Sequence, residues 1–254
     1  MIFLITPKFN IKFYQMKKTI VLLMAIPLFY GCGSLEEVIS QFPQSTQNGI
    51  ISNTDIASGL KEALNNGITK QVTKLTATDG FYKNEAVKIL LPEELKKVDS
   101  ALRKVGLGSL ADEGVKYMNR AAEDAVKEAT PIFVDAIKAM SFTDAKNILL
   151  GNNNAATTYL QSSTSSALTA KFSPIIQNSY TKVGADKIWT EIITKYNTIP
   201  LVQKVNPDLT AYTTQKAMDG VFKMIAVEEK NIRTNISSRS STLLQKVFAL
   251  QDNN

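Results

Sequence analysis

The segment NTDIASGLKEALNNGITKQVTKL, residues 53–75, decides the fold class of this sequence. Its apolar and small residues recur at steps of three and four, at Ile56, Leu60, Ala63, Leu64, Gly67, Ile68, Val72 and Leu75. Because an α-helix turns once every 3.6 residues or so, this spacing predicts an amphipathic helix with one apolar face. Asn53 or Thr54 is suited to cap its first turn.

The rest of the chain repeats the helical period and contains almost no alternating strand pattern. Pro131 is expected either to kink a helix or to divide it in two. The whole pattern predicts an all-α fold: a single, bundle-like domain of about eight helices over residues 54–250, with a disordered tail at 251–254. Further helices are expected over 91–105, 109–140, 144–150, 155–170, 174–183, 186–197, 208–233 and 243–248.

The amino-acid composition excludes several classes of protein and of catalytic site. The 254 residues are 44% apolar and 20% charged, which is typical of a globular domain and not of a disordered or polytopic membrane chain. The sequence has no histidine, which excludes Ser-His-Asp and Cys-His catalysis and His-ligated zinc. A single cysteine excludes an intramolecular disulfide and a multi-cysteine metal cage. No cofactor is predicted.

Residues 1–31 are typical of a secretory signal peptide. Lys17 and Lys18 place positive charge before the apolar run at 20–30, which is short for a membrane span. The pattern begins at Met16, so we expect Met16 to be the true start.

Gly31 followed by Cys32, at the end of this apolar run, resembles the lipobox of bacterial lipoproteins. The resemblance implies cleavage between the two residues and attachment of lipid, including palmitate, to Cys32. Phe29 and Tyr30 depart from the pattern, because they are bulkier than its usual Leu and Ala or Ser. The alternative is an ordinary leader, or a single-span anchor, with an incidental cysteine.

The polar stretch that completes residues 32–53 is expected to be a flexible tether between the lipid and the domain. Gly33 and Ser34 lack the aspartate that resembles an inner-membrane retention signal. We therefore expect an outer-membrane lipoprotein of the cell envelope, facing the periplasm rather than the cell surface.

The net charge of +6 does not indicate nucleic acid. Four lysines fall before Cys32 and no acid does, so the remainder has 29 − 4 = 25 basic and 23 acidic residues, a balance of +2. No basic face for phosphate binding is expected. The expected partners are the membrane, through the lipid, and an envelope protein or a hydrophobic ligand.

Four polar residues stand out by their position on helical faces. At 100° per residue, Asn119 and Glu123 lie beside a stripe of small side chains, whereas Arg120 points away. Glu229 lies close to the centre of the apolar face of helix 208–233, and Arg233 is its partner one turn later. A carboxylate there must be paired, protonated or placed at a site. The simplest interpretation is a structural ion pair.

The functional alternative places Asn119, Glu123 and Glu229 in a pocket between helices, poised for acid/base work or ligand binding. Glu228 and Glu229 in tandem also suggest an oxygen-ligated cation, although no metal site is predicted. The motif GLGSLA at 106–111 matches a dinucleotide loop, but a charged helix precedes it where a strand is required, so it is interpreted as a helix-ending turn.

Short motifs distributed along the helical region carry a resemblance to a known family. They are, in order, DGF at 79–81, GLG at 106–108, MNRAAE at 118–123, DAI at 135–137 with Met140, AATTY at 155–159, KAMDGVF at 216–222, EEKNIR at 228–233 and KVF at 246–248. From about Asp55 to Phe248 the chain resembles the helical envelope lipoprotein family known as domain of unknown function 4197. The resemblance implies an all-α domain in the Gram-negative envelope and no assigned activity, so it transfers no catalytic residues.

These observations predict a lipid-anchored, non-catalytic binding or structural module. The Ser/Thr-rich helix at 157–173 and the apolar face at 243–248 are its candidate contact surfaces, and core packing is the other explanation for both. One alternative is an envelope hydrolase that uses two of Glu123, Glu228 and Glu229. The other is a lipid carrier, which requires an apolar cavity of a few hundred Å³.

Overall fold

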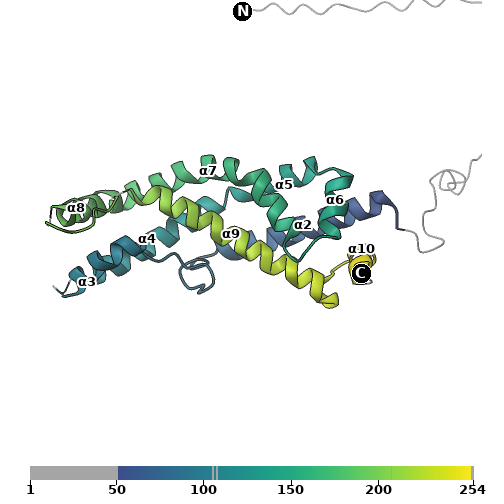
Figure 1. Ribbon diagram of the computed structural model, residues 1–254, viewed down its shortest axis with the longest axis horizontal. Helices are drawn as coiled ribbons and strands as arrows, with labels where there is room; N and C mark the ends of the chain where they lie inside the picture. The colour runs from purple at the N-terminus through teal and green to yellow at the C-terminus, as the bar shows by residue number, and fades with distance from the viewer. Residues whose placement is uncertain (1–50, 105, 107, 199, 207, 253–254) are drawn as a thin grey trace, which may run out of the picture. The chain divides into compact units, whose positions relative to one another are not determined.

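The computed structural model describes residues 51–252, except for residues 105, 107, 199 and 207 and the side chain of Ile188 (Figure 1). All of these residues belong to one compact unit, 45–254, and the other unit, 1–44, lies outside the described residues. The described part contains nine α-helices, two short 3-10 helices and no strand, so the all-α prediction is confirmed. The α-helices are α2 (Asn53–Thr76), α3 (Lys96–Lys104), α4 (Gly108–Val126), α5 (Ala129–Ala139), α6 (Phe142–Leu149), α7 (Ala155–Val183), α8 (Ala185–Asn197), α9 (Leu209–Thr234) and α10 (Thr242–Asp252).

Helix α2 lies at the centre of the packing, against α4, α5, α6, α9 and α10. Its expected apolar face is the buried one, and the side chains of Leu60 and Leu75 are almost fully enclosed. The cap differs from the expectation. Ser52, and neither Asn53 nor Thr54, is the N-cap, because Ser52 and Asp55 each bond the other's backbone N–H in a capping box.

The expected helix 109–140 is two helices. The chain breaks at Lys127 and Glu128, and Pro131 then lies in the first turn of α5. A proline costs little in a first turn, because the N–H that it lacks has no acceptor within the helix. Proline therefore marks the start of α5 and does not kink a longer helix.

Helix α7 is one continuous helix where two were predicted. Pro174 lies inside it, and the apolar side chains on both sides remain on one face. Leu168, Phe172 and Ile176 follow at four-residue steps and are all fully buried. Ending the helix before Pro174 would turn this stripe out of the core, so packing outweighs the local cost of proline.

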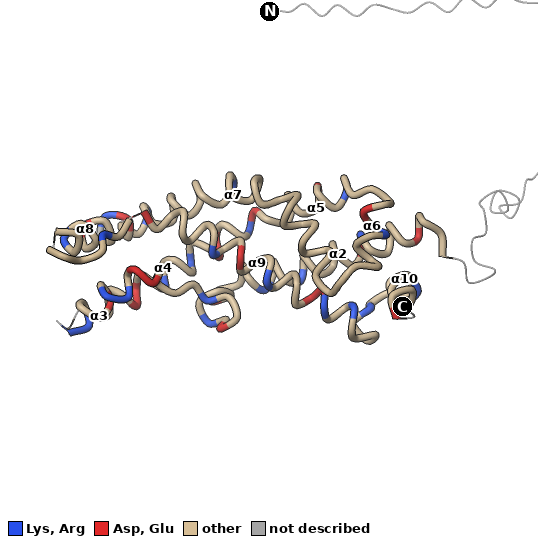
Figure 2. The backbone as a smooth tube through the Cα atoms, viewed as in Figure 1, with Lys and Arg blue, Asp and Glu red and all other residues tan. Residues whose placement is uncertain are grey.

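The Ser/Thr-rich part of α7 faces solvent along most of its length. Figure 2 shows few charged residues on this helix, and Lys171 is the single charged residue between Lys146 and Lys182. Several hydroxyls donate to the helix's own carbonyls, such as Thr169 to Ser165 at 2.8 Å. The buried side of α7 packs against α4 and α9.

Helix α10 covers one side of α2 and continues to Asp252, two residues into the predicted tail. Arg239 donates to both carboxylate oxygens of Asp252, which holds the last turn in place. Leu244, Val247 and Phe248 are buried, so the apolar face at 243–248 is mainly core. Val247 touches α2 at Gly59, where an added Cβ would come within 2.7 Å of its Cγ2 atom.

Candidate functional site

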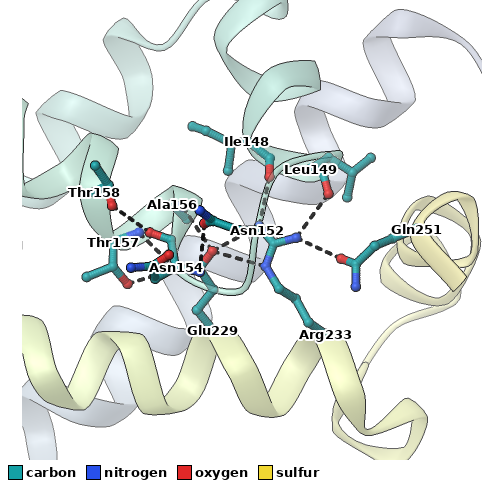
Figure 3. Close-up of polar contacts among 10 residues, drawn as sticks. All are labelled: Ile148, Leu149, Asn152, Asn154, Ala156, Thr157, Thr158, Glu229, Arg233 and Gln251. Atoms are coloured by element: carbon teal, nitrogen blue, oxygen red, sulfur yellow. Dashed lines mark hydrogen bonds and ion pairs between the residues drawn. The ribbon is translucent and has the colours of Figure 1, made fainter. Parts of the chain in front are cut away.

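The most enclosed charged pair in the described part joins Glu229 and Arg233 of α9 (Figure 3). The side chains are 5% and 1% exposed, and Arg233 donates from Nε and Nη2 to Glu229 Oε1 at 3.0 and 2.9 Å. They stand four residues apart, in the Glu-before-Arg order that favours pairing within a helix. The local partnership expected from the sequence is present.

Glu229 also caps the first turn of α7. The backbone N–H groups of Ala156 and Thr157 donate to its two carboxylate oxygens at 2.9 and 2.8 Å, and the Thr157 hydroxyl adds a third bond at 2.8 Å. These amides belong to the first turn of α7, whose N-cap residue Asn154 makes no side-chain cap. A carboxylate from another helix thus takes the place of the missing cap, where the helix dipole favours negative charge.

Arg233 caps the last turn of α6 in a corresponding way. Its guanidinium donates to the carbonyls of Ile148 and Leu149 at 2.7 and 3.0 Å, and to Gln251 Oε1 of α10 at 2.7 Å. The last carbonyls of a helix lack partners within it and favour a cation. The Glu229–Arg233 pair therefore fixes the turn between α6 and α7 from both sides.

Asn119 and Glu123 hold a different part of the chain, the long segment between α2 and α3. Asn119 pairs with both backbone groups of Ile89, each at 2.8 Å. Glu123 accepts from the N–H groups of Phe81 and Tyr82 at 3.1 and 3.4 Å. The side chains of Phe81 and Ile89 are buried, so these polar contacts attach an irregular segment to the core.

Arg120 was expected to point away from the stripe of small side chains, and its side chain is 32% exposed, against 5% for Glu123. It nevertheless takes part in this network, because its long side chain donates to Glu123, one turn further along α4, at 2.7 Å and also to Asp79. A hydrogen bond from Lys83, and then the charge of Arg120, hold the pKa of Asp79 below its ordinary value. The i, i+3 spacing of Arg120 and Glu123 was the sequence signal for this contact.

The four predicted polar residues therefore form two networks. Gly220 of α9 lies against Phe81, a partner of Glu123, since an added Cβ there would come within 2.7 Å of the Phe81 ring. Glu229 lies nine residues further along α9, which is about 13 Å at 1.5 Å per residue. No hydrogen bond or ion pair joins the two networks in the described part of the chain.

Glu228 belongs to a third set of contacts. It accepts from Lys70 and Gln71 of α2 at 2.6 and 2.7 Å, while its neighbour Glu229 points to α7. The two adjacent carboxylates thus serve different helices. Within the described residues, no three acidic or cysteine side chains lie close enough together to hold a metal ion.

An apolar pocket of about 20 Å³ lies beside Glu229, between α2, α9 and α10. Its walls include Leu60, Ile68, Ile225 and Phe248. This volume is far below the few hundred Å³ that a lipid carrier requires. Among the helices described, none is long and apolar enough to span a bilayer.

Cys32 and Gly31, together with the predicted signal peptide and most of the tether, lie outside the described residues. The lipidation site therefore remains a prediction from the sequence. Sequence reasoning also missed Thr157, whose hydroxyl completes the shell of Glu229. Nothing in the local pattern of α7 indicates that a residue 72 positions away caps it.

The family model described as protein of unknown function (DUF4197) matches residues 50–249, nearly the whole helical region. The chain belongs to this family. The expected resemblance is confirmed by this match. None of the curated proteins and none of the solved structures compared with the chain matches it.

Proposed function

We propose that this member of the DUF4197 family is a lipoprotein of the bacterial outer membrane, a non-catalytic helical module held at the envelope by lipid on Cys32. The observation that carries the proposal is the leader that ends in Gly31-Cys32, followed by a polar stretch. Helix α2 begins at Asn53, which leaves about twenty residues for a tether between the lipid and the first helix.

The contacts of Glu229 and Glu123 support a structural use of the buried charges. Glu229 accepts from two backbone amides, one hydroxyl and two guanidinium nitrogens. A general acid or base must exchange a proton with a substrate, and a carboxylate so occupied has little capacity left. These contacts favour a binding or structural module over a carboxylate-dependent hydrolase.

The test is the substitution Cys32→Ala in the producing bacterium. The expected result is a folded domain that moves from the membrane fraction to the soluble envelope fraction after a high-salt wash. An alkyne analogue of palmitate should label the parent protein and leave the Cys32→Ala protein unlabelled. A matched control, Ser34→Ala, should stay on the membrane and keep the label.

A Cys32→Ala protein that remains on the membrane would contradict the lipid anchor and point to an uncleaved span. Intact mass of the parent distinguishes these cases, because cleavage leaves an acylated Cys32 as the first residue. Loss of the helical circular dichroism signal in Cys32→Ala would instead contradict the separation of tether and domain.

A further inference from the structure

A pocket of about 190 Å³ opens where α7 ends and where α8 and α9 begin. Figure 1 shows α8 at the same end of the described region as the start of α9. Pockets for drug-sized ligands are usually about 300–1,000 Å³, so this one suits a single small ring. The residues that decide its chemistry are Gln177, Tyr180, Asp186, Trp189, Thr190 and Asp208.

Two aromatic side chains form the apolar wall of this pocket. Trp189 and Tyr180 are 6% and 5% exposed, so each side chain presents only a small part of its ring to the pocket. The indole of Trp189 also packs on α4 at Gly114, where an added Cβ would come within 2.1 Å of the ring. The hydroxyl of Tyr180 bonds Thr213 at 2.5 Å, and burial raises the pKa of Tyr180, so the phenol stays neutral.

Two carboxylates form the polar edge, and neither has an ion-pair partner among the described residues. Asp208 accepts from the Thr210 N–H at 2.8 Å as the cap of α9, and its Oδ2 atom accepts nothing from the described chain. Asp186 accepts from Lys187 N and from the hydroxyl of Thr181. A carboxylate has about four acceptor positions, so both keep capacity for donors from a ligand.

The pocket also offers one donor that lacks an acceptor in the described part of the chain. The Nε1 edge of the Trp189 indole faces Gly114 of α4, so Trp189 supplies ring surface to the pocket and no donor. The donor is the amide nitrogen of Gln177, because the side chain of Gln177 forms its one bond through Oε1, from the Thr210 hydroxyl at 2.7 Å. Two acceptors and one donor therefore border the aromatic wall.

The two carboxylates limit the charge that a ligand of this pocket can carry. Asp186 and Asp208 repel an anion. An ammonium group would pair with them but would face the positive ends of two helices, and it would leave the Gln177 amide nitrogen without an acceptor. A neutral hydroxyl both donates to a carboxylate and accepts from an N–H, and the C–H faces of a sugar ring are apolar.

We propose that this pocket binds one neutral sugar ring, with hydroxyls on Asp186 and Asp208 and a ring face on Trp189. The proposal goes beyond the anchoring role and does not depend on it, since binding is measured in solution on the Cys32→Ala protein. Failure of anchoring and failure of sugar binding are therefore separate results.

The chain carries a single tryptophan, Trp189, so intrinsic fluorescence reports this pocket directly. Glucose and N-acetylglucosamine serve as probes, with ethylene glycol at equal osmolality as the control for bulk effects. We expect a saturable change with at least one sugar and a dissociation constant on the order of 1 mM. Chitotriose distinguishes a free monosaccharide from a glycan chain: tighter binding indicates the chain and equal binding indicates a single ring.

The variant Asp208→Asn removes the charge and keeps the helix cap, because asparagine caps as well as aspartate. It should weaken sugar binding at least about tenfold, since a charge-assisted hydrogen bond is lost. The matched control is Glu191→Gln on the exposed side of α8, which should bind as the parent does. The circular dichroism of both variants verifies the fold.

Three outcomes would overturn the proposal. The first is no saturable change with any of the sugars. The second is saturation with butylammonium and not with the sugars, which would assign the carboxylates to a cation. The third is a folded Asp208→Asn protein that binds sugar as tightly as the parent.

Discussion

At the scale of single residues, this molecule uses buried charge to complete helix ends. Glu229 supplies the acceptors that the first turn of α7 lacks, and Arg233 supplies the donors for the last turn of α6. A buried pair of this kind costs desolvation, and the hydrogen bonds to four backbone groups offset that cost. The contribution of each residue to the stability of the fold therefore depends on the presence of the other.

The substitution Glu229→Gln tests this dependence. It leaves Arg233, 1% exposed, without its counter-ion, and removing one partner of a buried pair costs about 3–5 kcal/mol. Urea denaturation followed by circular dichroism should show this loss in the free energy of unfolding. Asp219→Asn, an exposed charge on the same helix, should change it by less than about 0.5 kcal/mol. Equal effects of the two substitutions would refute the structural role of Glu229.

At the scale of elements, periodicity predicts which segments are helical, and long-range packing decides where they end. The apolar spacing of α2 and α9 is visible in the sequence, and both helices form close to their expected bounds. The continuity of α7 is not visible locally, because Pro174 is a helix breaker until Phe172 and Ile176 are packed. The split of the expected helix 109–140 into α4 and α5 adds one helix, and the continuity of α7 removes one, so the nine helices described stay close to the eight or so expected.

The candidate site likewise has a local part that the sequence predicts and a long-range part that it does not. The i, i+4 spacing predicts the partnership of Glu229 and Arg233, because both residues lie on one helix. The caps that they provide to α6 and α7 depend on residues 72 to 85 positions away, which no local pattern encodes. The three-dimensional separation of Glu123 from Glu229 was likewise outside the reach of a rotation argument on single helices.

Pro174→Ala should stabilise the protein, because α7 is continuous through this position. Alanine restores the N–H that can donate to the carbonyl of residue 170, and interior proline costs about 3 kcal/mol relative to alanine. Part of this gain is lost because alanine leaves the unfolded chain more flexible. We expect the free energy of unfolding to rise by about 1 kcal/mol or more, with Ser173→Ala as the neighbouring control. A loss of stability would show that the helix is broken at this position.

The pair that holds α10 predicts a dependence on pH. Its hydrogen bonds from Arg239 lower the pKa of Asp252 below the ordinary 3.8. The stabilisation is therefore complete above the unfolded-state pKa and is lost as pH falls through the folded-state pKa. Asp252→Asn should reduce stability at pH 7 and have a smaller effect below about pH 3. Thermal unfolding of both proteins at the two pH values measures the difference, and an equal effect at both would contradict the ion pair.

At the scale of the whole domain, one continuous apolar core joins helices from α2 to α10. Leu60 on α2, Phe133 on α5 and Val247 on α10 are all buried members of it. A core of this kind predicts cooperative unfolding in one step. Among the helices that the structure describes, none has a separate core on which it could persist alone.

Two probes check this cooperativity. Trp189 fluorescence reports α8 and its contacts with α4, α7 and α9, while circular dichroism reports all the helices. In urea the two signals should change with the same midpoint, to within the error of the fits. An earlier midpoint for Trp189 would show that α8 and its surroundings unfold first, as a unit of lower stability.

The caps supplied by α9 also determine when, during synthesis, the turn between α6 and α7 can form its hydrogen bonds. Helices α6 and α7 leave the ribosome long before α9, and the bonds that close their shared turn join residues 73, 84 and 85 positions apart. Until residue 233 has been synthesised, the start of α7 has no acceptor from Glu229 and the end of α6 has no donor from Arg233. The turn between α6 and α7 can therefore acquire its full set of hydrogen bonds only after the chain has been synthesised through α9.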